Sequence, residues 1–333
     1  MRAGTDARPA PLAAWLATGY FALCFYRFGT LLLTLVMKPP ELGTVHQFFP
    51  AFMAEFNRLM GPVCYGPAVA LVLVAAALPR FGPGTFPRWA VWASVGLAGV
   101  SVAGSLLVVR PLYEELARSG FSPDRLAHLV ATRMWVEVLP ATGQVLLALG
   151  LLNDWLRATR PLGRGLFMAL FATGFYGMGV GYVESFVNYP LWLVVGPTDW
   201  LAFRHAIPSF QSFVLVFLLP AFAPVLLLGP LAWFRPRAVP GWAVALVAAG
   251  FGWIVYITAT YFVPHLQAPL DAAYSAPLIR ELMRNDLLLR GPVGLLVWLL
   301  PAWMLVRAVR HPTAAATPAR PAAPPGTLVA HAN

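Results

Sequence analysis

The chain has 333 residues, of which 59% are hydrophobic and only 11% are charged, and its formal net charge is +10. Soluble domains contain about 25% charged residues, so this composition excludes a soluble enzyme with one compact core, a coiled coil and a disordered chain. The basic residues separate long apolar runs and do not cluster on one polar face, so their excess does not indicate nucleic-acid binding.

Long apolar segments predict eight transmembrane helices and therefore an all-α, polytopic fold. A helix needs about 20 mostly apolar residues to cross the bilayer core. The first segment contains Arg27 and lacks a small-residue cleavage site, so we expect a retained anchor and not a signal peptide. In chain order the expected spans are 12–37, 59–78, 89–109, 134–152, 166–195, 210–234, 241–263 and 287–306.

Basic residues near the span ends predict the orientation. With eight spans, both termini lie on one side of the membrane, together with the loops after spans two, four and six. That side carries 12 Lys and Arg residues against Asp6 and Asp154, whereas the other side carries ten basic and ten acidic residues. An excess of Lys and Arg marks the cytoplasmic side. We therefore expect a cell-membrane protein, plasma or inner, with segment 1–11 and a disordered, Ala/Pro-rich tail at 311–333 in the cytoplasm.

Short motifs recur along the chain and predict an internal repeat. A first four-span repeat is expected at 12–155 and a second at 166–310. An even number of spans gives both repeats the same orientation, with a pseudo-twofold axis along the membrane normal. The matches are P-x-F at 50–52 and 208–210 with prolines at 62 and 220 (offset 158), P-x-W at 87–89 and 240–242 (offset 153), and prolines at 140 and 292 (offset 152).

Charged residues inside the apolar spans are candidates for function. A central Arg or Asp costs roughly 2.5–3.5 kcal/mol on insertion scales. The repeat offsets place Arg27 near the depth of Glu184, and Glu137 near that of Arg290. We expect Arg27 to pair with Glu184 and Glu137 with Arg290 across the repeats. The alternative is that each side chain reaches the outer headgroups separately.

The outer face holds most of the histidines and is the predicted location of a site. Histidine and carboxylate side chains bind metals or transfer protons. The candidate metal ligands are His46 and His128, although no close spacing such as H-E-x-x-H occurs, so any ligation depends on tertiary contacts. The sequence leaves the cofactor unknown, including whether the protein holds a metal or haem. Segments 122–133 and 270–290 are charged and amphipathic, and we expect them to lie at the membrane interface. The candidate catalytic residues are Arg27, Glu184, Glu137 and Arg133.

Three stretches of the first repeat share a pattern with a known family. They are F-N-R-L-M-G-P at 56–62, V-R-P-L at 109–112 and R-M-W at 133–135. Over about 120 residues the chain resembles the four-helix membrane family that includes the anthrone oxygenase-like proteins. The resemblance implies a four-helix membrane bundle with oxygenase-like activity. In the fourth helix Trp135 is followed by Val136 and Glu137, where that family has Asn and Arg.

Three classes of function are compatible with these patterns. The first is a membrane oxidoreductase, oxygenase-like, with an outward-facing polar pocket for a small hydrophobic substrate. The second is a small-molecule permease, because duplication and intramembrane charges are typical of transporters. The third is an accessory subunit of a membrane complex, since no sharp catalytic motif occurs. Charged residues are scarce in the cytoplasmic halves of the spans, which disfavours transport. The expected partner in every case is the lipid bilayer, and the sequence leaves the oligomeric state open.

Overall fold

The computed structural model describes residues 9–206, 211 and 214–311. All regular secondary structure in these residues is helical, and eight of the helical segments are long and apolar enough to cross a membrane. The expected all-α polytopic fold is confirmed. The expected segments 1–11 and 311–333, and the motif at 208–210, fall wholly or mostly outside the described residues.

The first four segments contain ten helical elements. Here α denotes an α-helix and η a π-helical stretch within a longer helix. The elements are α1 (Pro11–Leu42), α2 (Phe49–Met60), η1 (Gly61–Tyr65), α3 (Gly66–Phe81), α4 (Arg88–Ala103), η2 (Gly104–Val109), α5 (Arg110–Ser119), α6 (Pro123–Arg133), η3 (Met134–Val138) and α7 (Leu139–Trp155).

The last four segments repeat this pattern of α-helices interrupted by π-helical stretches. A single left-handed residue, Gly196 (φ 76°), kinks α9. The elements are α8 (Pro161–Val183), η4 (Glu184–Asn188), α9 (Tyr189–Arg204), η5 (Val214–Leu218), α11 (Leu219–Phe234), α12 (Gly241–Ile257), η6 (Thr258–Gln267), α13 (Ala268–Ala272), α14 (Ala276–Asn285), η7 (Asp286–Arg290) and α15 (Gly291–Arg310).

Proline explains the π-helical stretches. Each of the seven in the described residues is followed by an α-helix with proline as its second residue, as in Gly66-Pro67, Leu139-Pro140 and Gly291-Pro292. Proline has no N–H to donate, and its ring collides with the carbonyl four residues earlier. The turn before it widens in response, and such π-bulges occur frequently at functional sites. Pro220 follows Leu219 at the start of α11, so it takes the place of Pro67 and not, as the 158-residue offset predicted, of Pro62.

The spans are longer than the bilayer core is thick. A helix of 32 residues such as α1 is about 48 Å long, against a core of about 30 Å. On the third span the exposed side chains are apolar from Trp89 to Val108 and then become charged at Arg110, Glu114 and Arg118. The helices therefore continue well beyond the apolar belt at one end.

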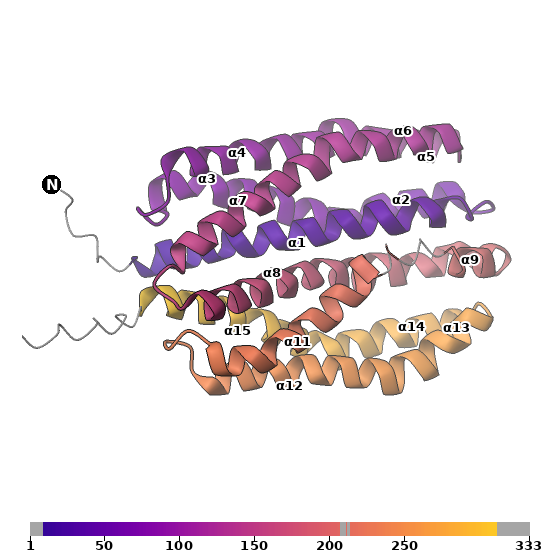
Figure 1. Cartoon of the computed structure of the whole chain (residues 1–333). Coiled ribbons are helices and arrows are strands. Elements are labelled where there is room, and N and C mark those ends of the chain that lie inside the picture. The colour runs from indigo at the N-terminus through magenta and orange to yellow at the C-terminus, as the bar shows by residue number, and fades with distance from the viewer. Residues whose placement is uncertain (1–8, 207–210, 212–213, 312–333) are drawn as a thin grey trace, which may run out of the picture.

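That projecting end, called here the distal end, consists of α2, α5, α6, α9, α13 and α14. Figure 1 shows it opposite the start of α1, the end of α15 and the hairpins 82–87, 156–160 and 235–240. The helices α6 and α14 run straight into the spans of which they form the first turns. Segments 122–133 and 270–290, which we expect at the membrane interface, thus belong to helices that project from the ends of the spans. Their apolar faces pack inside the distal end, where Leu129, Ile279 and Leu282 are buried.

Helices α1 and α8 lie side by side at the centre of the molecule (Figure 1). Two glycines make this close approach possible. A Cβ on Gly29 would overlap the backbone carbonyl of Tyr176, and a Cβ on Gly179 would overlap that of Tyr26. Small residues at helix interfaces allow such backbone contact inside membranes. The contact is reciprocal, because Tyr-x-x-Gly occurs once on each helix, 150 residues apart.

Candidate functional site

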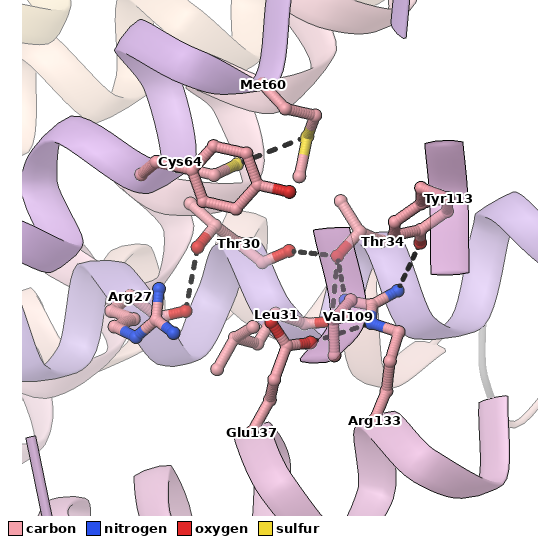
Figure 2. A pocket seen from close by; sticks show the side chains of 11 residues that line it. Arg27, Thr30, Leu31, Thr34, Met60, Cys64, Val109, Tyr113, Arg133 and Glu137 are labelled. Carbon is pink, nitrogen blue, oxygen red and sulfur yellow. Dashed lines mark hydrogen bonds and ion pairs between the residues drawn. The ribbon is translucent and has the colours of Figure 1, made fainter. Parts of the chain in front are cut away.

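A buried cavity, shown in Figure 2, lies within the first four segments. Its lining residue Val109 lies next to Arg110, where the exposed side chains of the third span become charged. The space left among its lining side chains is about the size of one water molecule. All four segments contribute to its wall. The lining residues are Arg27, Thr30, Leu31 and Thr34 of α1, Met60 of α2, Cys64 and Tyr65 of η1, Val109 of η2, Tyr113 of α5, Arg133 of α6 and Glu137 of η3.

An ion pair between Arg133 and Glu137 forms one side of the cavity. Arg133 Nε lies 2.7 Å from Glu137 Oε2, and each side chain is only 3% exposed. The same guanidinium donates to Tyr113 Oη at 2.9 Å and to Thr34 Oγ1 at 2.8 Å. All three guanidinium nitrogens of Arg133 therefore have partners, which is the condition under which a buried charge is tolerated.

Arg27 enters the site from α1 and has no carboxylate within ion-pair distance among the described residues. Its Nη2 atom donates to Ser105 Oγ at 2.8 Å and to Ser101 Oγ at 3.1 Å, while its Nε atom is buried without a hydrogen-bond partner. Ser105 Oγ also forms a short hydrogen bond with Glu137 Oε1. Ser105 thus connects the two charged groups.

These contacts leave the cavity with an excess of positive charge. Two guanidinium groups, of Arg27 and Arg133, share the single carboxylate of Glu137, and all three side chains are at most 3% exposed. In a medium of low dielectric, charges that water does not screen interact strongly. The site is therefore suited to hold an anionic or acidic group.

The expected ion pairs between the halves are wrong. Glu184 accepts a hydrogen bond at 2.6 Å from Asn188 Nδ2, one turn further along its own helix, and does not pair with Arg27. Arg290 Nη2 lies 2.5 Å from Asp286 Oδ1 and does not pair with Glu137. Side chains four residues apart lie on the same helix face, so a local partner is available without any contact between helices. Arg27 also faces α4 of its own half and not α8.

The ion pair of Asp286 and Arg290 has the same four-residue spacing as that of Arg133 and Glu137, but the carboxylate precedes the arginine. Arg133 directly precedes η3 and Glu137 lies within it, whereas Asp286 and Arg290 are the first and last residues of η7, each 153 residues later. Each arginine also contacts a tyrosine hydroxyl: Arg133 donates to Tyr113, and Arg290 donates to Tyr189 Oη at 3.3 Å. Of the four predicted catalytic residues, the cavity therefore brings together Arg27, Arg133 and Glu137, and Glu184 lies outside it.

The predicted metal ligands are not brought into one cluster. The side chain of His46 is exposed, and its backbone N–H donates to Asp199 Oδ2 at 2.7 Å. His128 is exposed beside a surface hollow that Glu115, Asp124 and Arg125 also line. Within residues 9–206, 211 and 214–311, no three His, Cys, Asp or Glu side chains are grouped so that they could hold a metal ion.

Two serines and one lysine of structural importance were not predicted as site residues. Ser101 and Ser105 provide the acceptors for Arg27, and their spacing of four residues in an otherwise apolar span is the signal that points to a polar contact. Lys38 is 1% exposed and pairs with Glu41 at 2.6 Å. The Lys-Pro-Pro-Glu sequence after the expected first span could have indicated this local pair.

Comparison with known proteins identifies no matching family model, no similar curated protein and no similar solved structure. The chemistry of the cavity is consequently the main guide to function.

Proposed function

We propose that this multi-pass membrane protein is an enzyme of the oxygenase-like oxidoreductase type that binds a small acidic molecule in the cavity of its first half. The observation that carries the proposal is the buried cluster in which Arg27 and Arg133 face the single carboxylate of Glu137. Fixed positive groups in a site shielded from water stabilise negative charge that forms on a substrate.

The polar residues divide the chemical roles of such a site among them. Arg27, with its unpartnered Nε, would hold the anionic form of the substrate. Glu137 would accept or return a proton, with Ser105 and Arg133 holding its carboxylate in place. The Tyr113 hydroxyl, bound to Arg133, is a second acidic hydrogen in reach of the cavity.

The oxygenase assignment depends on the resemblance in the first repeat. The three stretches that carry it contribute Met60, Val109 and Arg133 to the cavity wall. Segments that lie far apart in the sequence thus meet at one site, which supports reading them as one functional pattern.

Oxygen-dependent turnover of extracted molecules tests this proposal. Purified protein would be incubated with a lipid extract of the producing cells, and products would be detected by mass spectrometry with and without O₂. We expect products that need O₂ and that disappear with Glu137→Gln. The matched control is Glu55→Gln, because Glu55 makes an exposed ion pair with Arg58 at the distal end, outside the cavity. Turnover that survives Glu137→Gln, or no turnover at all, would refute the proposal.

We also propose that the distal end faces away from the cytoplasm of the cell membrane. The excess of Lys and Arg near the opposite end supports this orientation. Both native cysteines, Cys24 and Cys64, are buried, so a single introduced cysteine can be labelled selectively. A membrane-impermeant thiol reagent added to intact cells should label Glu55→Cys and not Arg157→Cys. The reverse labelling would overturn the orientation.

We further propose that the chain contains two parallel four-helix repeats. The bounds of α3 and α11 differ by 153 residues at both ends, and η1 and η5 differ by the same amount. The reversed ion pairs at 133/137 and 286/290 keep that offset. The reciprocal glycine contacts between α1 and α8 are the geometry expected from a pseudo-twofold axis between the halves.

Transport is a second candidate because the buried polar residues of the first half continue below the cavity. Tyr20 Oη donates to Ser94 Oγ at 2.8 Å, and Gln144 Nε2 is buried without a hydrogen-bond partner. Tyr20 lies two turns before Arg27 on the same face of α1, so polar groups continue from the cavity toward the start of that helix. Uptake of a small organic anion into liposomes containing the protein, abolished by Gln144→Leu, would support transport over enzymatic turnover. An absence of uptake would remove it.

A further inference from the structure

The cavity has one wall that reaches the molecular surface. Ten of its eleven lining residues are buried, and Tyr65 alone is half-buried. Tyr65 ends η1, directly before α3. Among the lining residues, Tyr65 is therefore the one at which the cavity wall comes nearest to the surface.

This wall lies at the height of the lipid and not of the aqueous phase. Tyr65 is separated from the hairpin 82–87 by the 16 residues of α3, which span about 24 Å, within the bilayer core of about 30 Å. Arg27 lies at the same height, because 16 residues also separate it from the start of α1 at Pro11. Below Tyr65, one and two helical turns along α3, Val69 and Leu73 are exposed and apolar. Lipid chains therefore cover the surface around Tyr65.

The cavity admits only a small chemical group. It has room for about one water molecule. A carboxylate is larger than one water, so the lining side chains must shift to admit it, but a phosphate ester is larger still and requires a greater shift. The rest of any ligand must stay outside Tyr65, among the lipid chains, and is therefore apolar.

The charge of the site selects the same group. The cavity has an excess of one positive charge, and Arg27 Nε is a buried donor without an acceptor. A carboxylate provides acceptor oxygens for a guanidinium in charge-assisted, often bidentate, hydrogen bonds. It would neutralise the excess charge and satisfy that donor at the same time.

We propose that the natural ligand is an amphiphilic carboxylic acid that enters sideways from the bilayer past Tyr65 and places its carboxylate beside Arg27. This inference rests on the proposed function in using the same cavity, and it names the class of molecule that binds there. The apolar chain remains in the membrane, so the protein takes its ligand from the lipid phase.

Binding to the full-length protein in lipid nanodiscs tests the ligand class. The probe is dodecanoate, measured by equilibrium dialysis, with dodecanol as the uncharged match, acetate as the headgroup without a chain, and dodecyl phosphate as the larger headgroup. We expect saturable binding of dodecanoate in a one-to-one ratio. Loss of a charge-assisted contact should weaken that binding about tenfold or more in Arg27→Gln, and the alcohol and the phosphate should bind correspondingly less. Arg58→Gln, which removes an exposed positive charge, is the matched control.

A second variant tests the route and does not alter the charged groups. Tyr65→Trp enlarges the residue at the entrance, so association of dodecanoate should slow while the stoichiometry stays one to one. Acetate binding as tightly as dodecanoate would overturn the membrane route. Equal binding by dodecanol, or equal losses in Arg27→Gln and Arg58→Gln, would overturn the carboxylate site.

The two proposals can fail separately. Arg27-dependent binding of dodecanoate without oxygen-dependent turnover would refute the enzymatic function and support the ligand class. Turnover that depends on Glu137, on molecules that carry no carboxylate, would refute the ligand class alone.

Discussion

The ion pair of Arg133 and Glu137 allows the most direct test of how the first half is stabilised. Replacing Glu137 with Leu removes the only carboxylate of the cavity and leaves Arg27 and Arg133 buried without a counter-charge. Replacing Arg133 with Met leaves Glu137 with Ser105 as its remaining hydrogen-bond partner, and it removes the donors to Tyr113 Oη and Thr34 Oγ1.

The expected cost follows from burial. Breaking a buried ion pair by removing one partner costs about 3–5 kcal/mol, because the other charge stays in a medium of low dielectric. Both side chains are only 3% exposed, so solvent screening does not reduce that cost much. Arg133→Met with Glu137→Leu in the same chain removes both charges and leaves apolar side chains. The double variant should therefore be less destabilised than Glu137→Leu alone, which leaves both Arg27 and Arg133 without a carboxylate, and less than the sum of the two single variants.

Reversible unfolding in mixed detergent micelles measures these free energies. The matched control is Glu55→Leu, which breaks an exposed ion pair with Arg58, 68% exposed, and should change the free energy of unfolding little. The reasoning would be refuted if the two single variants lost no more stability than Glu55→Leu. It would also be refuted if their effects simply added in the double variant, since additivity means that the two groups do not interact.

Three further predictions concern other contacts. Gly29→Ala and Gly179→Ala should each destabilise the protein by about 1–3 kcal/mol or more, because the new Cβ would overlap backbone atoms of the facing helix. Gly19→Ala should not destabilise the protein, because no atom lies near its Cβ position. Thermal unfolding of the three variants measures the difference. Asp199→Ala should lower the free energy of unfolding by about 1–3 kcal/mol, because the carboxylate accepts two partly buried backbone hydrogen bonds from the loop between α1 and α2. Faster amide hydrogen exchange in that loop would report the loss of these bonds. Unchanged exchange would contradict the prediction. Asp286→Leu should destabilise the second half without reducing dodecanoate binding, and reduced binding would mean that the two halves form one site.

The sequence by itself determined the membrane fold. Hydropathy depends on composition over about 20 residues, and it needs no knowledge of which helices touch. The eight spans were therefore predicted from local segments such as 89–109, and the structure confirms them. Proline positions are local in the same way: Pro67 and Pro140 mark the ends of π-helical stretches because the missing N–H acts within one turn. The cost of burying charge also identified Arg27 and Glu137 as residues that require partners.

Only the tertiary structure decided which partners those charges have. A pairing depends on the rotation of each helix about its axis and on where its neighbours lie, and neither is encoded in a run of apolar residues. Arg27 faces Ser101 of α4 and Ser105 of η2 and not Glu184, although equivalent depth had suggested the latter. The same holds for the cavity, whose wall combines α1, η1 and η3 from different spans. Depth along the membrane follows from the sequence, whereas direction around each helix follows from packing.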